Sequence, residues 1–355
     1  MGLDSGANSL QSSIIGNTLG RNRVTQALCA TSIVATDIGY AMISKLVKST
    51  SASSTASRID RIIMDSRNRS ESNKVPNEQK TAVVTGANSG IGFETAKALG
   101  RAGYHTILAC RNTEHGKKAV ERLEQLTGLS SQFEFVALDL ASLESVCSFI
   151  EHFKKRDCAL DILVNNAGVA CPYGQTIDGI EMQFGTNHVG HFALTLGLLD
   201  SLKRAADGAR IVIVSSMAAY MVARISYDGI EQKEKFFSMR NYALSKLANM
   251  TFAKALAARL HGSGVSVNAV NPGAVATNLS RHGASHRYQQ AILSAMFLDP
   301  PTGAICSIYA ALSPDLDGVS GVFYSRCLPM DMHPMALDTA EQGKLWTYTE
   351  KLIAK

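Results

Sequence analysis

The feature that most constrains the fold is a regular alternation of two kinds of segment that begins at Lys80. Short apolar runs, each about the length of one buried strand, are separated by longer segments with helical periodicity. The short runs are 81–85, 106–110, 133–138, 161–165, 210–215 and 265–271. Strands that are apolar throughout need helices on both faces, as in a doubly wound (Rossmann) parallel α/β sheet. We therefore expect residues 80–355 to form a single domain of this class.

The first 79 residues differ from this domain in composition. Residues 1–58 contain seventeen serines and threonines but only two acids, Asp4 and Asp37. A start that is rich in hydroxyls, carries arginines and is poor in acids is typical of organelle transit segments, and equally of a disordered tail. Residues 49–79, rich in serine, arginine and asparagine, are predicted to be a linker. We interpret 1–79 as a partly disordered leader that directs the protein to an organelle or a membrane; without that role the protein would be cytoplasmic.

A semi-apolar stretch inside the leader, Gln26 to Ser44, bears on membrane association. Its five aliphatic side chains favour insertion of a helix into a bilayer by roughly 1.5–3 kcal/mol, but a central Asp37 opposes it by roughly 2.5–3.5 kcal/mol. A spanning helix is therefore not favoured. A helix lying on a membrane surface and a disordered segment stay open as alternatives.

Charge and cysteine content exclude several classes of function. The net charge is +5, more than half of it within residues 1–79, and no basic run or basic stripe with interleaved aromatic residues occurs. We therefore expect no nucleic-acid partner. The seven cysteines are scattered and form no C-x-x-C pair. This pattern favours neither a disulfide scaffold nor a thiolate zinc site, and it fits a reducing compartment.

The first apolar run leads directly into a glycine-rich turn, and a helical pattern follows it. Gly86 permits a tight turn, Gly90 lets backbone amides approach a pyrophosphate, and Gly92 allows the helix to pack on the strand. The phosphates would lie at the positive N-terminus of that helix. The strand before and the helix after distinguish this turn from an ordinary one. The predicted dinucleotide site includes Thr85, Gly86, Asn88, Ser89, Gly90, Ile91 and Gly92.

Polar residues at the ends of the next two runs bear on which dinucleotide binds. Arg111 follows the second run, about twenty residues beyond the glycines. An acid there would bind the 2′-hydroxyl of the adenosine ribose, whereas Arg111 can hold a 2′-phosphate. We therefore predict NADP(H) rather than NAD(H), with a solvated surface arginine as the alternative. Asp139 follows the third run and either receives the adenine amino group or caps the next helix.

A candidate proton donor, Tyr242, lies near the start of a long helical segment. Its i, i+4 spacing puts Lys246 on the same face of that helix. A phenol has a pKa near 10, and lowering it by about three units requires roughly 4 kcal/mol, which a desolvated cation can supply. About half a Tyr-x-x-x-Lys pair is expected by chance in a chain of this composition, so the neighbouring motifs decide.

Other polar residues are predicted at the same edge of the sheet. The run 210–215 brings Ser215 and Ser216 to its carboxyl end, where ligands bind in open α/β sheets and a hydroxyl could hydrogen-bond a reacting carbonyl. The run 161–165 brings Asn165-Asn166-Ala167-Gly168 to that edge. Asn187 lies inside a helical pattern that asparagine disfavours, so it either has a role or is an ordinary polar helix residue.

Together these motifs resemble the classical short-chain dehydrogenase/reductase family. The resemblance covers essentially all of 80–355 and rests on motifs in the expected order: Thr85-Gly86-x-x-x-Gly90-x-Gly92, Asn165-Asn166-Ala167-Gly168, Asn187, Ser216, Tyr242-x-x-x-Lys246 and Asn271-Pro272-Gly273. Finer features resemble the branch of retinol dehydrogenases and WW-domain oxidoreductases. These are residues 109–112, 186–192, 335–338 and 345–346.

The resemblance implies a role for each matching residue. Tyr242 would be the general acid/base, Lys246 would lower its pKa and bind the nicotinamide ribose, and Ser216 would polarise the carbonyl. Asn187 would support a water-linked proton relay from Lys246. Further contacts to the cofactor would come from Asn166, Ala167, Gly168, Pro272, Gly273 and Thr277, the last through the carboxamide. Hydride would pass directly between the nicotinamide and the carbonyl carbon, without a metal.

The substrate is predicted to be a bulky apolar carbonyl or alcohol, such as a retinoid, a steroid or a lipid aldehyde. Ser216 and Tyr242 are twenty-six residues apart, longer than the common family spacing. We expect 217–241 to form one wall of the cleft and 278–298 the other; the alternative is that 278–298 simply packs on the core. Their apolar and aromatic residues are Tyr220, Met221, Ile225, Phe236 and Phe237, and Leu279, Tyr288, Ile292, Leu293, Met296 and Phe297.

We therefore predict an NADP(H)-dependent oxidoreductase, with carbonyl reduction as the favoured direction because cells keep NADPH reduced. One alternative is a noncatalytic, dinucleotide-binding redox sensor, against which the intact catalytic motif counts. Another is a protochlorophyllide reductase-like enzyme, disfavoured because the strand before Asn165 lacks the cysteine-bearing pattern of that family. No metal is expected, since the pairs His188/His191 and His282/His286 lack a third ligand nearby. A homo-oligomer is compatible with the sequence.

Overall fold

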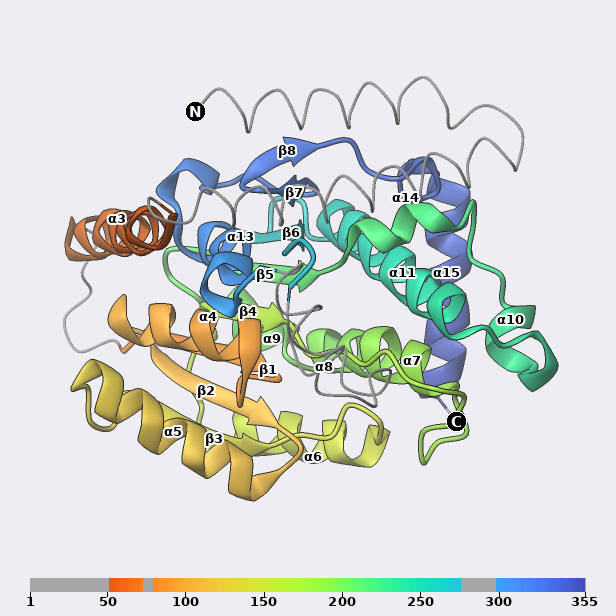
Figure 1. Ribbon diagram of the computed structural model, residues 1–355, viewed down its shortest axis with the longest axis horizontal. Coiled ribbons are helices and arrows are strands. Elements are labelled where there is room, and N and C mark those ends of the chain that lie inside the picture. Colours follow the sequence, from red (N-terminus) through yellow and green to blue (C-terminus); the bar gives the residue numbers. More distant parts are fainter. Residues whose placement is uncertain (1–50, 73–78, 276–297, 355) are drawn as a thin grey trace.

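The structure, a computed structural model, describes residues 51–72, 79–275 and 298–354. Its centre is a single sheet of eight strands in the order β3-β2-β1-β4-β5-β6-β7-β8 (Figure 1). The strands are β1 (Thr81–Thr85), β2 (His105–Cys110), β3 (Phe133–Ala137), β4 (Ile162–Asn165), β5 (Ala209–Val214), β6 (Val265–Asn271), β7 (Phe323–Ser325) and β8 (Leu328–Met330). The six predicted runs are the first six strands, and every predicted boundary lies within one residue of the observed one.

The sheet is mixed rather than wholly parallel. Strands β1 to β7 pair in parallel, and β8 runs antiparallel to β7. These last two strands have three residues each, too few to show a periodicity in the sequence. After β3 the chain returns to place β4 beside β1, so the strand order reverses there. In doubly wound sheets ligands bind at such a switch point, beyond the carboxyl ends of the strands.

Helices cover both faces of the sheet, as the doubly wound prediction requires. One face is covered by α4 (Gly90–Arg101), α5 (Thr113–Thr127) and α13 (Pro300–Leu312). The other is covered by α6 (Leu143–Lys154), α8 (Gly190–Gly197), α9 (Leu199–Lys203), α11 (Ser238–Arg259) and α15 (Thr339–Ile353). Each face of the sheet has its own hydrophobic core, and alternate residues of β1 point into the two cores. Val83 packs toward α6 and α11, and Ala82 and Val84 pack toward α4 and α13.

Shorter segments connect these elements. They are α7 (Met182–Phe184), a π-helix (Gly185–Val189), α10 (Asp228–Glu231), α14 (Pro334–Leu337) and three 3₁₀ turns at Met217–Met221, Lys233–Lys235 and Pro314–Leu316. Among the described helices none is long and apolar enough to cross a membrane. The leader stretch Gln26 to Ser44, Thr277, His282 and His286, and the wall 278–298 apart from Leu298, lie outside the described residues.

The linker prediction for 49–79 is wrong over residues 51–72, which form the helix α3 (Ser51–Ser72). This helix lies against α13 and α4 at one side of the molecule (Figure 1). Ile62 and Ile63 are buried in the core beneath it, and Ile59 packs against the same core. Together with the buried Ser66 they follow the i, i+3, i+4, i+7 spacing of a helical stripe. The many serines and arginines around the stripe obscured that signal.

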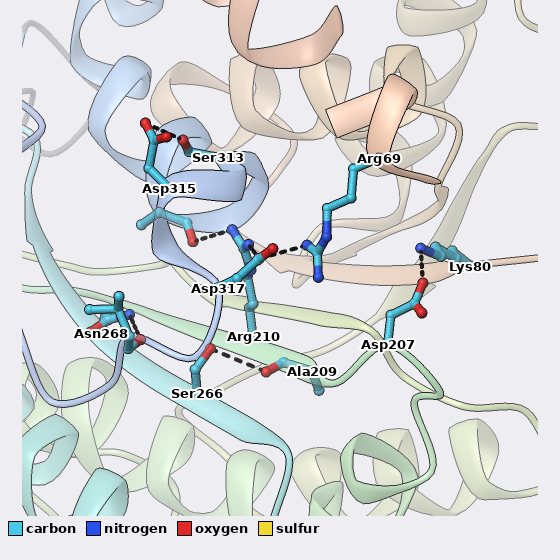
Figure 2. A network of polar contacts seen from close by, with 12 residues as sticks. Arg69, Lys80, Asp207, Ala209, Arg210, Ser266, Asn268, Ser313, Asp315 and Asp317 are labelled. Atoms are coloured by element: carbon cyan, nitrogen blue, oxygen red, sulfur yellow. Dashed lines mark hydrogen bonds and ion pairs between the residues drawn. The ribbon is translucent and has the colours of Figure 1, made fainter. Parts of the chain in front are cut away.

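Ion pairs join α3 to the amino edge of the sheet, where the strands begin (Figure 2). Arg69 Nη1 lies 2.7 Å from Asp317 Oδ1, and the same carboxylate pairs with the buried Arg210 at the start of β5. Lys80, just before β1, pairs with Asp207 at 2.7 Å. Each of these cations therefore has a carboxylate partner at this edge.

Candidate active site

The glycine-rich turn links the carboxyl end of β1 to the N-terminus of α4. Gly86 and Gly90 have φ of 64° and 60°, in the left-handed region that other residues rarely adopt. A Cβ atom added to Gly92 would lie 2.5 Å from both the Gly86 carbonyl oxygen and Asn166 Nδ2. Glycine is thus required at all three predicted positions, for backbone conformation at two and for close packing at the third.

Hydrogen bonds hold the ends of β1 and β4 together beside this turn. The hydroxyl of Thr85 accepts the backbone N–H groups of Asn166 and Ala167, each at 2.9 Å. The Asn166 side chain donates in return to the Thr85 carbonyl at 2.7 Å. Two predicted motifs that are about 80 residues apart in the chain therefore form one unit at the switch point of the sheet.

The turn has the features needed to bind the pyrophosphate of a dinucleotide. Ser89, the N-cap residue of α4, makes no side-chain capping hydrogen bond, so its hydroxyl does not cover the first amides of the helix. Helix N-termini with exposed amides attract phosphate groups. Gly168 lies so close to the catalytic candidates that an added Cβ would be 3.3 Å from Asn187 Oδ1 and 3.4 Å from Lys246 Nζ. The residues present fit the predicted cofactor.

The residues after β2 and β3 lie at the same edge of the sheet. Arg111 directly follows β2 and is exposed. Asp139 Oδ1 accepts the backbone N–H of Ala141 at 3.0 Å and closes a turn before α6. The residue that caps α6 is Ser142, so the capping alternative for Asp139 is wrong. Its contact with the adenine ring stays a prediction, as does the contact of Arg111 with a 2′-phosphate.

Tyr242 and Lys246 lie on one face of α11, as their spacing predicts. Lys246 Nζ is 5.6 Å from the centre of the Tyr242 ring and donates to the carbonyl of Val214 at 3.1 Å. The lysine is 3% exposed and the tyrosine is half-buried. Ser216 hydrogen-bonds the Tyr242 phenol. The structure thus brings the three predicted groups together beyond the carboxyl end of β5.

Burial dominates the acid–base properties of this pair. It raises the pKa of Tyr242 to about 12, although the hydrogen bond from Ser216 acts in the opposite direction. Burial also lowers the pKa of Lys246 to about 8. Within the protein alone, the pKa of Tyr242 is thus raised by burial and lowered only by the Ser216 hydrogen bond, and the expected lowering by Lys246 is not among the causes. The phenol is protonated at neutral pH, which is the state needed to donate a proton.

Asn187 lies in the π-helix Gly185–Val189, a form of backbone found frequently at functional sites. Its Oδ1 accepts the Val169 N–H at 2.7 Å, and its Nδ2 donates to the Val169 carbonyl at 3.0 Å and to Ser245 Oγ at 2.9 Å. Ser245 directly precedes Lys246 on α11. The side chain of Asn187 therefore joins the segment after β4 to the helix that carries the tyrosine and the lysine.

Two further residues support the lysine and the loop beyond β6. Ser215 Oγ donates to the Lys246 carbonyl at 2.7 Å, a contact that sequence reasoning did not predict. Asn271, the last residue of β6, accepts the Met217 N–H at 3.3 Å. Pro272 and Gly273 follow at the same edge, and Gly273 has φ of 80°. Their contact with a cofactor stays a prediction.

Two buried histidines that the sequence presents as metal-ligand candidates bond to other protein groups instead. His188 contacts Thr349 Oγ1 at 3.0 Å and Asn249 Oδ1 at 3.4 Å. His191 contacts Thr85 Oγ1 at 2.8 Å and the Asn187 carbonyl at 3.0 Å. The sequence did not predict the contacts of His191 with Thr85 and Asn187. Their only local signal was the four-residue spacing from Asn187, which brings a helical side chain back toward that carbonyl.

Only part of the segment 217–241 is placed where it could form the predicted wall of a substrate cleft. Tyr220 and Ile225 are buried in the core, where the Tyr220 hydroxyl donates to the carbonyl of Asp331. Phe237 is 67% exposed and Met221 is 37% exposed. Tyr220 and Ile225 are therefore core residues, and Met221 and Phe237 remain candidates for contact with a substrate.

The comparison with known proteins agrees with this geometry. Residues 80–287 match the family model for short chain dehydrogenases. The chain belongs to this family. It is 41% identical over 288 residues to Retinol dehydrogenase 14 of Mus musculus, which covers 77% of this chain and 86% of the relative. It is 40% identical over 283 residues to Short-chain dehydrogenase TIC 32 B, chloroplastic, of Brassica napus, with 77% and 88% covered.

Solved structures show the same fold. A crystal structure of an uncharacterised protein from Mycobacterium paratuberculosis has a TM-score of 0.62 and 35% identity, and covers 78% of this chain and 94% of that one. A short chain dehydrogenase from Escherichia coli CFT073, complexed with NADPH, has a TM-score of 0.54 and 23% identity, with 70% and 97% covered. The chain is an oxidoreductase of the retinol dehydrogenase-like branch that acts on CH–OH or C=O groups with a nicotinamide dinucleotide.

Proposed function

We propose that this short-chain dehydrogenase is an NADP(H)-dependent enzyme that reduces a carbonyl on a bulky apolar substrate, with Tyr242 as the proton donor. The observation that carries the proposal is the meeting of Tyr242, Lys246 and Ser216 beyond β5. Lys246 lies against Gly168, and the Asn166-Ala167 segment before it is bonded to Thr85 at the start of the glycine-rich turn. Proton donor and dinucleotide-binding residues are thus adjacent.

The cofactor would be held by groups at the carboxyl edge of the sheet. The turn from Gly86 to Gly92 and the N-terminus of α4 would bind the pyrophosphate, and Arg111 the 2′-phosphate. Lys246 would bind the nicotinamide ribose, and residues at 272–273 and 277 would lie beside the nicotinamide. When bound, the cofactor supplies the hydride. The relative solved with NADPH supports the choice of dinucleotide.

The side chains of this protein would donate the proton to the substrate oxygen and stabilise the phenolate that remains. The Ser216 hydroxyl would orient the substrate oxygen next to the Tyr242 phenol. As negative charge develops on that oxygen, the phenol would donate its proton to it. The resulting phenolate would be stabilised by the Lys246 ammonium, because two opposite charges attract strongly in a buried site. Asn187 would support the return of a proton through water and Lys246.

The apolar substrate class is supported by two observations. Phe237 and Met239 are exposed, at 67% and 47%, around the first residues of α11. Large apolar side chains that remain exposed in a protein often mark a binding surface. The relatives at about 40% identity include Retinol dehydrogenase 14 of mouse and of human, whose name denotes an apolar alcohol.

The cofactor part of the proposal is tested by titrating the protein with NADPH and NADH. We expect the wild type to bind NADPH at least tenfold more tightly, and Arg111→Asp to lose that preference, because a carboxylate repels the 2′-phosphate. Lys155→Asp, which removes an exposed cation at the end of α6, is the matched control and should leave the preference unchanged. Tighter binding of NADH by the wild type would overturn the cofactor assignment and the preference for reduction.

The substrate part is tested by NADPH oxidation with a panel of aldehydes of increasing chain length and ring content. We expect kcat/KM to rise with apolar surface, at roughly tenfold for each 1.4 kcal/mol of transition-state binding. Faster turnover of small polar aldehydes would contradict an apolar cleft. Tight binding of NADPH without turnover of any member would favour a redox-sensing regulator.

A further inference from the structure

His191 joins two parts of the site that lie far apart in the chain. On one side its Nε2 is 2.8 Å from the hydroxyl of Thr85, at the end of β1. On the other its Nδ1 is 3.0 Å from the backbone carbonyl of Asn187. The ring is 1% exposed, and both partners are fully buried.

These contacts determine where the hydrogens lie. A carbonyl oxygen can only accept, so Nδ1 of His191 must carry a hydrogen and donate it to Asn187. Burial lowers the pKa of His191 to about 4, so the ring is neutral at physiological pH. The neutral ring then has an unprotonated Nε2, which accepts the hydroxyl hydrogen of Thr85.

This assignment leaves the Thr85 hydroxyl with its full set of hydrogen bonds. It donates to His191 and accepts the N–H groups of Asn166 and Ala167. The only other acceptor near the hydroxyl, among the hydrogen bonds of the described residues, is the Val164 carbonyl at 3.4 Å. If the imidazole were absent, the hydroxyl would turn toward Val164 and its lone pairs would turn away from the two amides.

We propose that His191 is a positioning residue that couples the cofactor-binding turn to Asn187. Its Nε2 orients the Thr85 hydroxyl, which holds the Asn166-Ala167 segment against the glycine-rich turn. Its Nδ1 fixes the carbonyl of Asn187, whose side chain bonds to the Val169 backbone and to Ser245, the residue before Lys246. The kinetic consequence of this role rests on the proposed function, whereas the effect on dinucleotide affinity does not.

The two nitrogens can be removed separately. His191→Gln places an amide oxygen near the position of Nε2 and keeps an acceptor for Thr85. His191→Asn places an amide nitrogen near the position of Nδ1 and keeps a donor for Asn187. His191→Phe removes both groups and retains an aromatic ring.

We expect a crossed pattern of effects. In His191→Asn the Kd for NADPH, measured by calorimetry, should rise about five- to tenfold while kcat stays within twofold of the wild type. In His191→Gln the Kd should stay within twofold and kcat should fall about five- to tenfold. These factors correspond to the loss of one buried hydrogen bond. If both variants changed the same quantity by the same factor, the coupling role would be wrong.

A double-mutant cycle separates coupling from general loss of packing. Thr85→Val removes the hydroxyl but keeps its shape. We expect the double variant Thr85→Val/His191→Phe to bind NADPH no more weakly than Thr85→Val alone. The Kd of the double variant should therefore be at least threefold lower than the two single effects multiplied together. Thr85→Ser should bind NADPH as tightly as the wild type. If the effects of the two substitutions simply multiplied, the proposed link would be absent. If His191→Phe did not fold, the cycle would be run with His191→Asn and judged by the same criterion.

His188 is the matched control. It is buried and neutral like His191 and lies three residues before it, but its partners are Asn249 and Thr349. His188→Asn should lower the thermal midpoint without a change in Kd for NADPH, and in a cycle with Thr85→Val it should show no coupling. An equal effect of His188→Asn on NADPH affinity would overturn the proposal. A wild type that binds NADPH but reduces no carbonyl would refute the proposed function. The Kd values for NADPH would still test the role of His191.

Discussion

The buried cations at the two edges of the sheet have different partners. At the amino edge Arg210 is buried beside Asp317, which also pairs with Arg69 of α3, and Lys80 pairs with Asp207 (Figure 2). At the carboxyl edge Lys246 is buried just as deeply, but its described polar contact is a backbone carbonyl rather than a carboxylate. Among the residues that the structure describes, the cations of the amino edge are paired with carboxylates, and Lys246 at the carboxyl edge is not.

The difference indicates what each edge contributes. A paired charge in a partly buried site joins elements and costs little, whereas an unpaired buried charge destabilises the fold. Proteins retain such unfavourable groups mainly where they are needed for function, and perturbed pKa values gather at functional sites. The amino edge is therefore the structural end of the sheet, and the carboxyl edge carries the proposed chemistry.

The largest effect that this comparison predicts is on turnover. Tyr242→Phe should lower kcat for carbonyl reduction by about 10²–10⁴-fold, because it removes the proton donor. The Kd for NADPH and the thermal midpoint should change little. Tyr220→Phe is the matched control: its hydroxyl donates to the Asp331 carbonyl within the core, so it should affect stability and leave kcat intact. Equal turnover by Tyr242→Phe and wild type would end the case for catalysis at the carboxyl edge.

A second prediction concerns the cost of the uncompensated cation. The pKa of Lys246 is about 8 in the fold, against 10.5 ordinarily, so the unfolded chain binds this proton more readily. Lys246→Met should therefore raise the free energy of unfolding by about 3 kcal/mol below pH 8. The gain should shrink as the pH rises from 8 toward 10.5, where the wild-type lysine loses its proton in both states. Denaturant titrations across this range measure it, and a destabilised variant at pH 7 would contradict the prediction.

At the amino edge, removal of a charge should lower the free energy of unfolding rather than raise it. Asp317→Asn removes the carboxylate that compensates Arg210, and we expect the free energy of unfolding to fall by about 1–3 kcal/mol. The value lies below that of a fully buried pair because Asp317 is 41% exposed. Asp315→Asn, two residues away, is the control and should change stability far less. Activity should persist in both variants; its loss in Asp317→Asn would mean that the two edges are not independent.

The smallest effect is expected for the ion pair that links α3 to this edge. Arg69→Met should lower the free energy of unfolding by less than about 1 kcal/mol, because both partners are substantially exposed. In contrast, Ile63→Ala, within the buried stripe of α3, should cost about 2 kcal/mol or more. Thermal unfolding of both variants decides whether packing or charge holds α3 in place. A larger loss from Arg69→Met would reverse that order.

Much of the site could be predicted because its signals are local. The turn from Gly86 to Gly92 requires glycine for reasons of backbone conformation and close packing. The i, i+4 spacing of Tyr242 and Lys246 places them on one helix face in any α-helix. Ser216 and the segment after β4 follow apolar runs, and the carboxyl ends of parallel strands share one edge.

The errors have a common cause in long-range packing. The stripe of α3 is short and surrounded by serines and arginines, and its burial depends on contacts with α13 and α4. Asp139 closes a turn rather than capping α6, since Ser142 is better placed for that cap. The pKa of Tyr242 moves upward because burial of the phenol, which no spacing reveals, outweighs the hydrogen bond from Ser216.

By itself, then, the sequence determined the first six strands, the turn and the order of the motifs, because periodicity, backbone preference and helical spacing act over a few residues. Only the tertiary structure decided which side chains meet. His191 and Thr85 lie 106 positions apart, and the helix after the π-segment must dock on β1 before their hydrogen bond can form. Burial and the absence or presence of a compensating charge follow from such contacts, and they set the ionisation states on which the proposed chemistry depends.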